Sequence, residues 1–111
     1  MLVEDMEPSS LVDIPSEDVE LIDVREEDEF TQLSIVGAKS CPLSSFEEDE
    51  STIDDSKEYI VFYCRSGKRS LTIAYDYLSR FPHLIHRVYN LKGGILAWNN
   101  LGYPIFSEKN P

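Results

Sequence analysis

The chain has 111 residues, of which 41% are hydrophobic and 28% charged, and these values predict one globular domain rather than a disordered or fibrous protein. The net charge of -11 is unevenly divided, because residues 1–58 carry 19 acidic and 3 basic side chains and residues 59–111 carry 2 and 7. An acidic chain repels a phosphate backbone and no run of about 18 apolar residues occurs, so we expect neither nucleic acid nor a membrane as a partner.

The first residues indicate a cytoplasmic protein with a loose N-terminus. Residues 1–5 lack the positive flank and the apolar stretch of a signal peptide, so we expect a cytoplasmic protein whose two cysteines stay reduced. Residues 1–9 are polar and acidic and are expected to be a flexible segment. One domain is then expected over residues 10–107, followed by a C-terminal tail over residues 108–111.

Short apolar segments alternate with helical patterns along the chain. β-Branched and aromatic side chains predict buried strands over residues 20–24 and 59–64, and weaker strands over residues 38–43 and 87–91. Helical turns or helices are expected over residues 25–30, 45–51 and 95–100, and over a longer stretch that starts at Ser70 and ends before Pro82. This alternation predicts an α/β domain whose central sheet is mostly parallel and has helices on both faces.

The segment with the clearest chemistry joins the strand over residues 59–64 to the next helix. It consists of Cys64, Arg65, Ser66, Gly67, Lys68, Arg69 and Ser70. Parallel α/β sheets bind ligands at the carboxyl ends of their strands, where the amide groups of a loop and a helix N-terminus form a cradle for an anion. Such a cradle, with three cationic side chains beside it, lowers the pKa of a cysteine. We therefore expect Cys64 to be a thiolate nucleophile that needs no histidine base, with Gly67 allowing the tight turn.

The loop over residues 64–69 resembles the six-residue active-site loop of the rhodanese (sulfurtransferase) family. Further matches follow in the order of that family: residues 21–25 (Leu-Ile-Asp-Val-Arg), residues 37–38 (Gly-Ala) and residues 91–98 (Leu-Lys-Gly-Gly-Ile-Leu-Ala-Trp). Within the family, the sequence is most similar to the rhodanese domains joined to the C-terminus of E1-like adenylyltransferases of molybdopterin and thiamine biosynthesis.

The resemblance implies a rhodanese-like fold and a sulfurtransferase that works through a persulfide on Cys64. The implied donor is a small sulfur compound such as thiosulfate, or a cysteine desulfurase. The implied acceptor is a nucleophile, and a ubiquitin-like sulfur carrier is one example. The resemblance also implies an adenylyltransferase domain as a further partner. Neither a metal nor an organic cofactor is required, and His83 and His86 lack the neighbouring ligands of a metal site.

Two alternatives stay open beside the sulfurtransferase. The first is a relative of the phosphatases and arsenate reductases, whose loop places five residues between the cysteine and the arginine, whereas only four separate Cys64 from Arg69. The second is a non-enzymatic interaction module, because this fold also occurs with its cysteine lost. The shorter loop and the presence of Cys64 favour the sulfurtransferase over both.

Other polar residues are secondary candidates. Asp23 and Arg25 follow a strand that we expect beside the Cys64 strand, and they either fix the loop by charged hydrogen bonds or form a local ion pair at the strand end. Cys41 is expected to be a small buried residue with nothing nearby to lower its pKa. The acidic residues 47–50 are expected to form a solvated loop or a docking surface for a basic partner.

Overall fold

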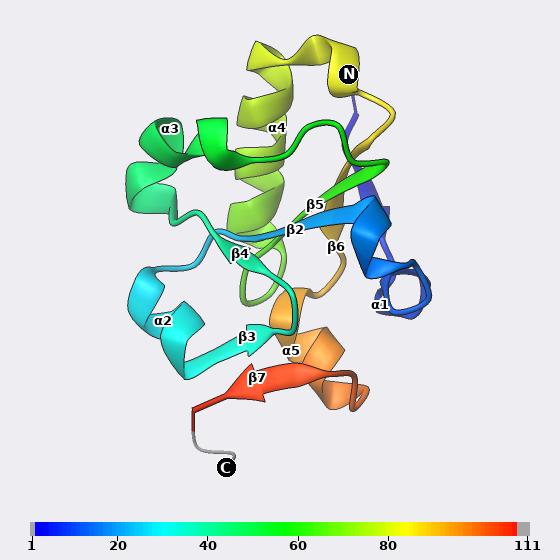
Figure 1. The fold of residues 1–111 in the computed structure, drawn as a ribbon, viewed down its shortest axis with the longest axis vertical. Helices are drawn as coiled ribbons and strands as arrows, with labels where there is room; N and C mark the ends of the chain where they lie inside the picture. Colours follow the sequence, from blue (N-terminus) through cyan, green and yellow to red (C-terminus); the bar gives the residue numbers. More distant parts are fainter. Residues whose placement is uncertain (1, 109–111) are drawn as a thin grey trace.

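Five strands form one parallel sheet at the centre of the computed structural model, which describes residues 2–108 (Figure 1). In spatial order the strands are β1 (Glu4–Met6), β6 (Val88–Leu91), β5 (Tyr59–Tyr63), β2 (Val19–Asp23) and β4 (Lys39–Ser40). Two further strands, β3 (Leu33–Ile35) and β7 (Ile105–Ser107), pair with each other in the antiparallel sense. The expected α/β domain with a mostly parallel sheet is confirmed.

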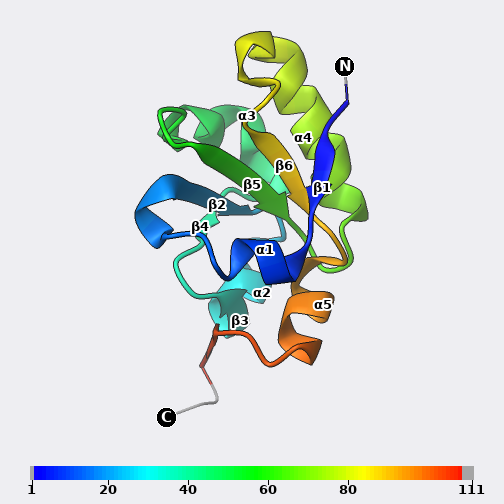
Figure 2. The ribbon, with the colours of Figure 1, turned by 90° about the vertical axis from the view of Figure 1, so that its right-hand side faces the viewer.

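Helices cover both faces of the sheet (Figure 2). The α-helices are α1 (Pro8–Leu11), α2 (Glu27–Gln32), α3 (Phe46–Asp49), α4 (Lys68–Arg80) and α5 (Gly94–Asn100). Short 3-10 helices span Ser16–Asp18, Leu43–Ser45, Glu50–Thr52 and Pro82–Leu84. Side chains of α3 and α4 pack on one face of the sheet, and those of α1 and α5 pack on the other.

The central strand β5 shows why both faces need cover. Ile60 and Phe62 belong to the core cluster on the α4 side, whereas Val61 and Tyr63 belong to the cluster on the α5 side. All four side chains are completely buried. Successive residues of a strand point to opposite faces, so a strand covered on both sides is apolar throughout rather than alternating.

The prediction of a flexible segment over residues 1–9 is wrong for its central part. Residues 4–6 form the edge strand β1, which pairs in parallel with β6, and Pro8 begins α1. Val3 and Met6 are buried, one in each core cluster, so two apolar side chains and a ladder of backbone hydrogen bonds hold this acidic segment in place. The domain therefore begins before residue 10. Residues 109–111 of the predicted tail lie outside the described part of the chain.

The structure also moves several predicted boundaries. Helix α4 begins at Lys68 rather than at Ser70, so the loop after β5 is shorter than expected. Strand β4 covers two residues of the predicted stretch over residues 38–43, although the amides of Cys41 and Leu43 still donate to the carbonyls of Asp23 and Val24 after it ends. Strands β3 and β7 have three residues each and are specified by their pairing with each other, which the sequence pattern does not reveal.

None of the helices within residues 2–108 combines the length and the apolar character that crossing a bilayer requires.

Candidate active site

Cys64 directly follows β5 and continues the pattern of that strand. It lies in the same core cluster as Ile60 and Phe62, so its side chain is on the face that α4 covers. Only 1% of its surface is exposed. The period of two along the strand therefore places the thiol under the first turn of α4, and a reagent must enter the loop to touch the sulfur.

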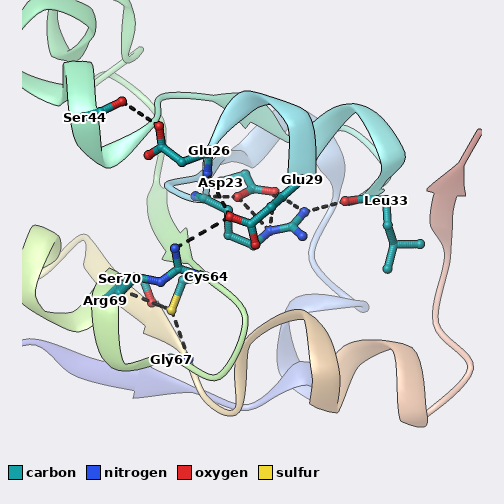
Figure 3. Close-up of polar contacts among 10 residues, drawn as sticks. Asp23, Glu26, Glu29, Leu33, Ser44, Cys64, Gly67, Arg69 and Ser70 are labelled. Atoms are coloured by element: carbon teal, nitrogen blue, oxygen red, sulfur yellow. Dashed lines mark hydrogen bonds and ion pairs between the residues drawn. The ribbon is translucent and has the colours of Figure 1, made fainter.

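Three hydrogen bonds converge on the Cys64 sulfur (Figure 3). The amide of Gly67 donates to Sγ at 3.1 Å, the amide of Ser70 donates at 3.4 Å, and the Ser70 hydroxyl lies 3.3 Å away. The first amide groups of a helix have no acceptor within the helix, and Gly67 at the start of α4 carries no side chain to supply one. The sulfur of Cys64 takes the place of the missing cap, which Gly67 permits by adopting a φ of +100°.

These hydrogen bonds lower the pKa of Cys64. Burial acts to raise the pKa of its thiol, but the Ser70 hydroxyl and the amides of Ser70, Gly67 and Ser66 outweigh burial, so the pKa lies below its ordinary value. The direction expected from the sequence is confirmed, but the main cause differs. From the sequence we expected the cationic side chains to lower this pKa as much as the helix N-terminus does. In the structure, hydrogen bonds from the loop and the first turn of α4 are the main cause of the lowered pKa.

Helix α5 closes the loop from outside. The amide of Ile95 donates to the Cys64 carbonyl at 2.9 Å, and the amide of Leu96 donates to the Arg65 carbonyl at 3.1 Å. Any Cβ at Gly94 would overlap both of these carbonyl oxygens. Glycine at position 94, the first residue of α5, is therefore required by the close approach of two backbones, and binding the carbonyls outside leaves amides of the loop directed at the sulfur.

The cationic side chains of the loop differ in their surroundings. Arg65 and Lys68 are exposed to solvent. Arg69 forms an ion pair with Glu29 of α2, with 3.7 Å between Nη1 and Oε1 and about 40% of the arginine side chain exposed (Figure 3). The structure thus brings Gly67 and Ser70 onto the sulfur and leaves Arg65, Ser66 and Lys68 on the surface around it.

Asp23 and Arg25 form a local ion pair instead of contacts with the cysteine loop. The Arg25 Nη2 lies 2.7 Å from Asp23 Oδ2 and also donates to the Leu33 carbonyl. Both side chains are almost fully buried. Burial opposes the charge of Arg25, but the hydrogen bonds and the charge of Asp23 prevail, so its pKa is raised. Their contacts fasten the end of β2 to β3, and neither residue is hydrogen-bonded to a side chain of the loop in the described chain.

Two residues near the site, Glu29 and Asn90, could not be predicted from the sequence of the cysteine loop. Glu29, the partner of Arg69, also completes a capping box at the start of α2 with Glu26, which is a helix-start pattern readable from the sequence. Asn90 on β6 accepts a hydrogen bond from Ser70 and donates one to the Gly67 carbonyl. A lone polar residue within an apolar strand is the only clue to Asn90 that the sequence offers.

The family of the chain follows from comparison with known proteins. The model of the rhodanese-like domain family matches residues 8–101, which include the loop, both glycines before α5 and every strand of the central sheet except β1. The chain belongs to the rhodanese-like domain family.

Relatives of this rhodanese domain carry sulfurtransferase names. A sulfurtransferase of Allochromatium vinosum is 38% identical over 94 residues, which are 85% of this chain and 84% of that protein. The adenylyltransferase and sulfurtransferase MOCS3 of Drosophila yakuba is 33% identical over 92 residues, which are 78% of this chain and 20% of the fly protein. The solution structure of the rhodanese-like domain from Anabaena sp. Alr3790 has a TM-score of 0.77 at 22% identity and covers 100% of this chain and 86% of that one. The fold is thus rhodanese-like, and the chain is a sulfurtransferase-type rhodanese domain.

Between residues 2 and 108, no three histidine, cysteine or acidic side chains are grouped closely enough to hold a metal ion.

Proposed function

We propose that this rhodanese domain transfers sulfane sulfur through a persulfide on Cys64. The observation that carries the proposal is the convergence of the Gly67 amide, the Ser70 amide and the Ser70 hydroxyl on one sulfur atom whose pKa is lowered. The thiolate is the nucleophilic form of cysteine, and donors already directed at its charge do not have to reorganise during the reaction.

In the first step the Cys64 thiolate attacks the outer sulfur of the donor. A new S–S bond forms to Cys64 while the S–S bond of the donor breaks, and the electron pair leaves on sulfite when the donor is thiosulfate. With a persulfidated cysteine desulfurase as donor, the leaving group is the thiolate of that protein. The exposed cations Arg65 and Lys68 favour an anionic donor at the mouth of the loop.

In the second step a nucleophilic acceptor attacks the outer sulfur, and the electron pair of the Cys64 persulfide bond returns to Cys64 as thiolate. Cyanide serves as a test acceptor and leaves as thiocyanate. The similarity to a protein named as both adenylyltransferase and sulfurtransferase supports a second kind of acceptor, the adenylylated C-terminus of a ubiquitin-like sulfur carrier, which is an electrophile. There the terminal sulfur of the persulfide attacks the acyl carbon and AMP leaves, and a thiol then cleaves the S–S bond to Cys64, which releases the thiocarboxylate and forms a disulfide with that thiol.

The test is intact-mass spectrometry after incubation with thiosulfate and, separately, with a persulfidated cysteine desulfurase. We expect wild type to gain the mass of one sulfur atom, about 32 Da, and to lose it when cyanide is added. Cys64→Ser gains nothing, whereas Cys41→Ser behaves like wild type and serves as the matched control, because each variant removes one buried thiol.

The outcomes separate the candidate functions. Absence of the adduct from wild type with both donors contradicts the proposal and leaves an interaction module. Hydrolysis of an aryl phosphate that depends on Cys64 indicates a phosphatase. An adduct formed only from the desulfurase identifies Cys64 as a relay between proteins and excludes thiosulfate as the donor.

A further inference from the structure

Asn90 is a buried polar residue in the middle of the sheet. It lies on β6 between the buried side chains of Val88 and Leu91 and beside Phe62 of β5, with 3% of its surface exposed. Val88, two residues earlier, packs in the core cluster on the α4 side, so Asn90 faces the first turn of α4 as Cys64 does. A polar side chain in this position needs hydrogen-bond partners to be tolerated.

The amide group of Asn90 uses both of its ends. Nδ2 donates to the Gly67 carbonyl at 3.1 Å and to the Asp5 carboxylate at 3.1 Å. Oδ1 accepts from the Ser70 hydroxyl at 2.6 Å. Two acceptors on one end and a hydroxyl donor on the other fix the orientation of the amide, because the reversed orientation would place Oδ1 against two oxygens.

The partners of Asn90 in the loop are two residues that donate hydrogen bonds to the Cys64 sulfur. Gly67 and Ser70 supply both of the amide hydrogen bonds drawn to Sγ, and Ser70 also supplies the hydroxyl. We propose that Asn90 is a positioning residue that holds Gly67 and Ser70 in place and so keeps their hydrogen-bond donors directed at the Cys64 sulfur. Its importance for catalysis rests on the sulfur transfer proposed above.

The arrangement differs from ordinary core packing. The Gly67 carbonyl already accepts the first bond of α4, from the Leu71 amide at 3.3 Å, so the bond from Asn90 is an additional restraint on the turn. The Ser70 hydroxyl has one hydrogen and two acceptors, Asn90 Oδ1 and the sulfur. The bond to Asn90 therefore holds the Ser70 oxygen beside the sulfur, and the hydrogen gives up this bond whenever it turns to the thiolate.

Asp5 extends this restraint to the edge of the sheet. Its carboxylate comes from β1, whose residue Asp5 is paired in register with Asn90. The bond joins residues 85 positions apart in the sequence. The cysteine loop is thus connected to β6 and, through it, to the N-terminal strand.

The experiment compares Asn90→Ala with Val88→Ala. Both variants shorten a buried side chain on the same face of β6, but only the side chain of Asn90 is hydrogen-bonded to the loop. The Cys64 pKa is measured in each from the pH dependence of its 13Cβ resonance, and the hydrogen-exchange protection of the Gly67 and Ser70 amides is measured on the same samples.

In Asn90→Ala we expect a raised Cys64 pKa, and therefore a rate of reaction of Cys64 with a thiol reagent that is about tenfold lower at pH 7. The hydrogen-exchange protection of the Gly67 and Ser70 amides should fall by at least about tenfold. The rate deficit should shrink as the pH rises, because the remaining thiol ionises. Val88→Ala should lower the stability without moving the Cys64 pKa. An unchanged or lowered Cys64 pKa in Asn90→Ala, or the same result in both variants, overturns the proposal.

A second variant keeps the test informative if Asn90→Ala fails to fold. Asn90→Asp has nearly the same volume and retains an acceptor for Ser70, but its ionised carboxylate has no hydrogen to donate to the Gly67 carbonyl or to Asp5. Protection of the Gly67 amide should fall while that of the Ser70 amide is kept. Loss at both amides, or at neither, contradicts the assigned geometry. These measurements need no sulfur donor, so they succeed or fail independently of the proposed sulfur transfer.

Discussion

Cys41 and Cys64 occupy equivalent places in the sheet but have opposite properties. Each directly follows a parallel strand, β4 or β5, and these strands flank β2 on its two sides. Both side chains are buried, with 0% and 1% of their surface exposed. Nevertheless the pKa of Cys41 is raised above its ordinary value, whereas that of Cys64 is lowered.

The difference lies in what surrounds each sulfur. Burial is the main reason for the raised pKa of Cys41, and its side-chain partner is the Thr52 hydroxyl at a distance of 3.9 Å. The residue after Cys41 is Pro42, which has no amide hydrogen, and a 3-10 helix follows instead of a long α-helix. Cys64 is followed by a turn and the start of a 13-residue helix. The position at a strand end is therefore not sufficient, and the donors supplied by the next segment determine the reactivity.

The largest expected contrast is in turnover. Cys64→Ser should reduce thiocyanate formation from thiosulfate and cyanide by at least about a thousandfold, because no other group can carry the sulfur. Cys41→Ser should stay within about twofold of wild type, because Cys41 has a raised pKa and no converging donors. Steady-state kinetics on both variants check this, and comparable losses would show that the two thiols cooperate.

The next contrast is between two glycines with positive φ. Gly94→Ala places a Cβ against the Cys64 and Arg65 carbonyls, so we expect about a hundredfold slower transfer and a free energy of unfolding lower by about 2–4 kcal/mol. Gly37→Ala meets no atom within 4 Å and should lower the free energy of unfolding by about 1 kcal/mol from backbone strain alone. Urea unfolding and turnover measure both. Equal effects would mean that α5 is not required to shape the loop.

The hydroxyl beside each thiol gives a smaller contrast. Ser70→Ala removes the largest of the hydrogen bonds that lower the Cys64 pKa, so that pKa should rise and transfer at pH 7 should fall about tenfold. Thr52→Val removes the hydroxyl beside Cys41 and should leave transfer within about twofold of wild type. The pH dependence of the rate provides the measurement: its midpoint should move upward only in Ser70→Ala, and an unmoved midpoint there would contradict the assigned cause.

The smallest expected effect is on stability against pH. The lowered pKa of Cys64 contributes stability that is present above the unfolded thiol value of about 8.5 and is lost as the pH falls through the folded pKa. The raised pKa of Cys41 contributes stability that is present below that value and is lost as the pH rises through the folded pKa. Urea unfolding measures the free energy of unfolding of wild type, Cys64→Ala and Cys41→Ala at pH values below and above the unfolded thiol pKa. The difference in this free energy between wild type and variant should change with pH in opposite directions for the two variants. Parallel slopes would show that the two environments do not differ.

The sequence predicts the parts of this site that depend on residues close together along the chain. The apolar run before Cys64, the glycine in the loop and the apolar stripe of the next helix all lie within about 20 residues, so strand, turn and helix could be placed in order. The fold class followed from the same alternation, and the resemblance to rhodaneses added its family. The lowered pKa of Cys64 was also predicted, whereas for Cys41 the sequence predicted only that nothing nearby lowers its pKa, and its raised pKa follows from burial.

The rest depends on contacts between distant segments. The edge strand β1 was missed because its acidic residues resemble a loose terminus, and it is held by pairing with the distant strand β6 and by the buried side chains of Val3 and Met6. The assignment of Asp23 and Arg25 as supports for the loop could not be decided before the structure showed them bound to each other and to Leu33. Asn90 was not predicted at all, since its partners Gly67 and Ser70 lie 23 and 20 residues away.

The binding of the Cys64 and Arg65 carbonyls by α5 has a consequence for the order in which the protein becomes reactive. During synthesis, β5 and α4 emerge from the ribosome before Asn90 and the first residues of α5. Until these later residues dock, the loop lacks the hydrogen bonds from the Ile95 and Leu96 amides to its outer carbonyls. We therefore expect the pKa of Cys64 to reach its lowered value only near the completion of folding, and a chain truncated before α5 to keep an ordinary thiol.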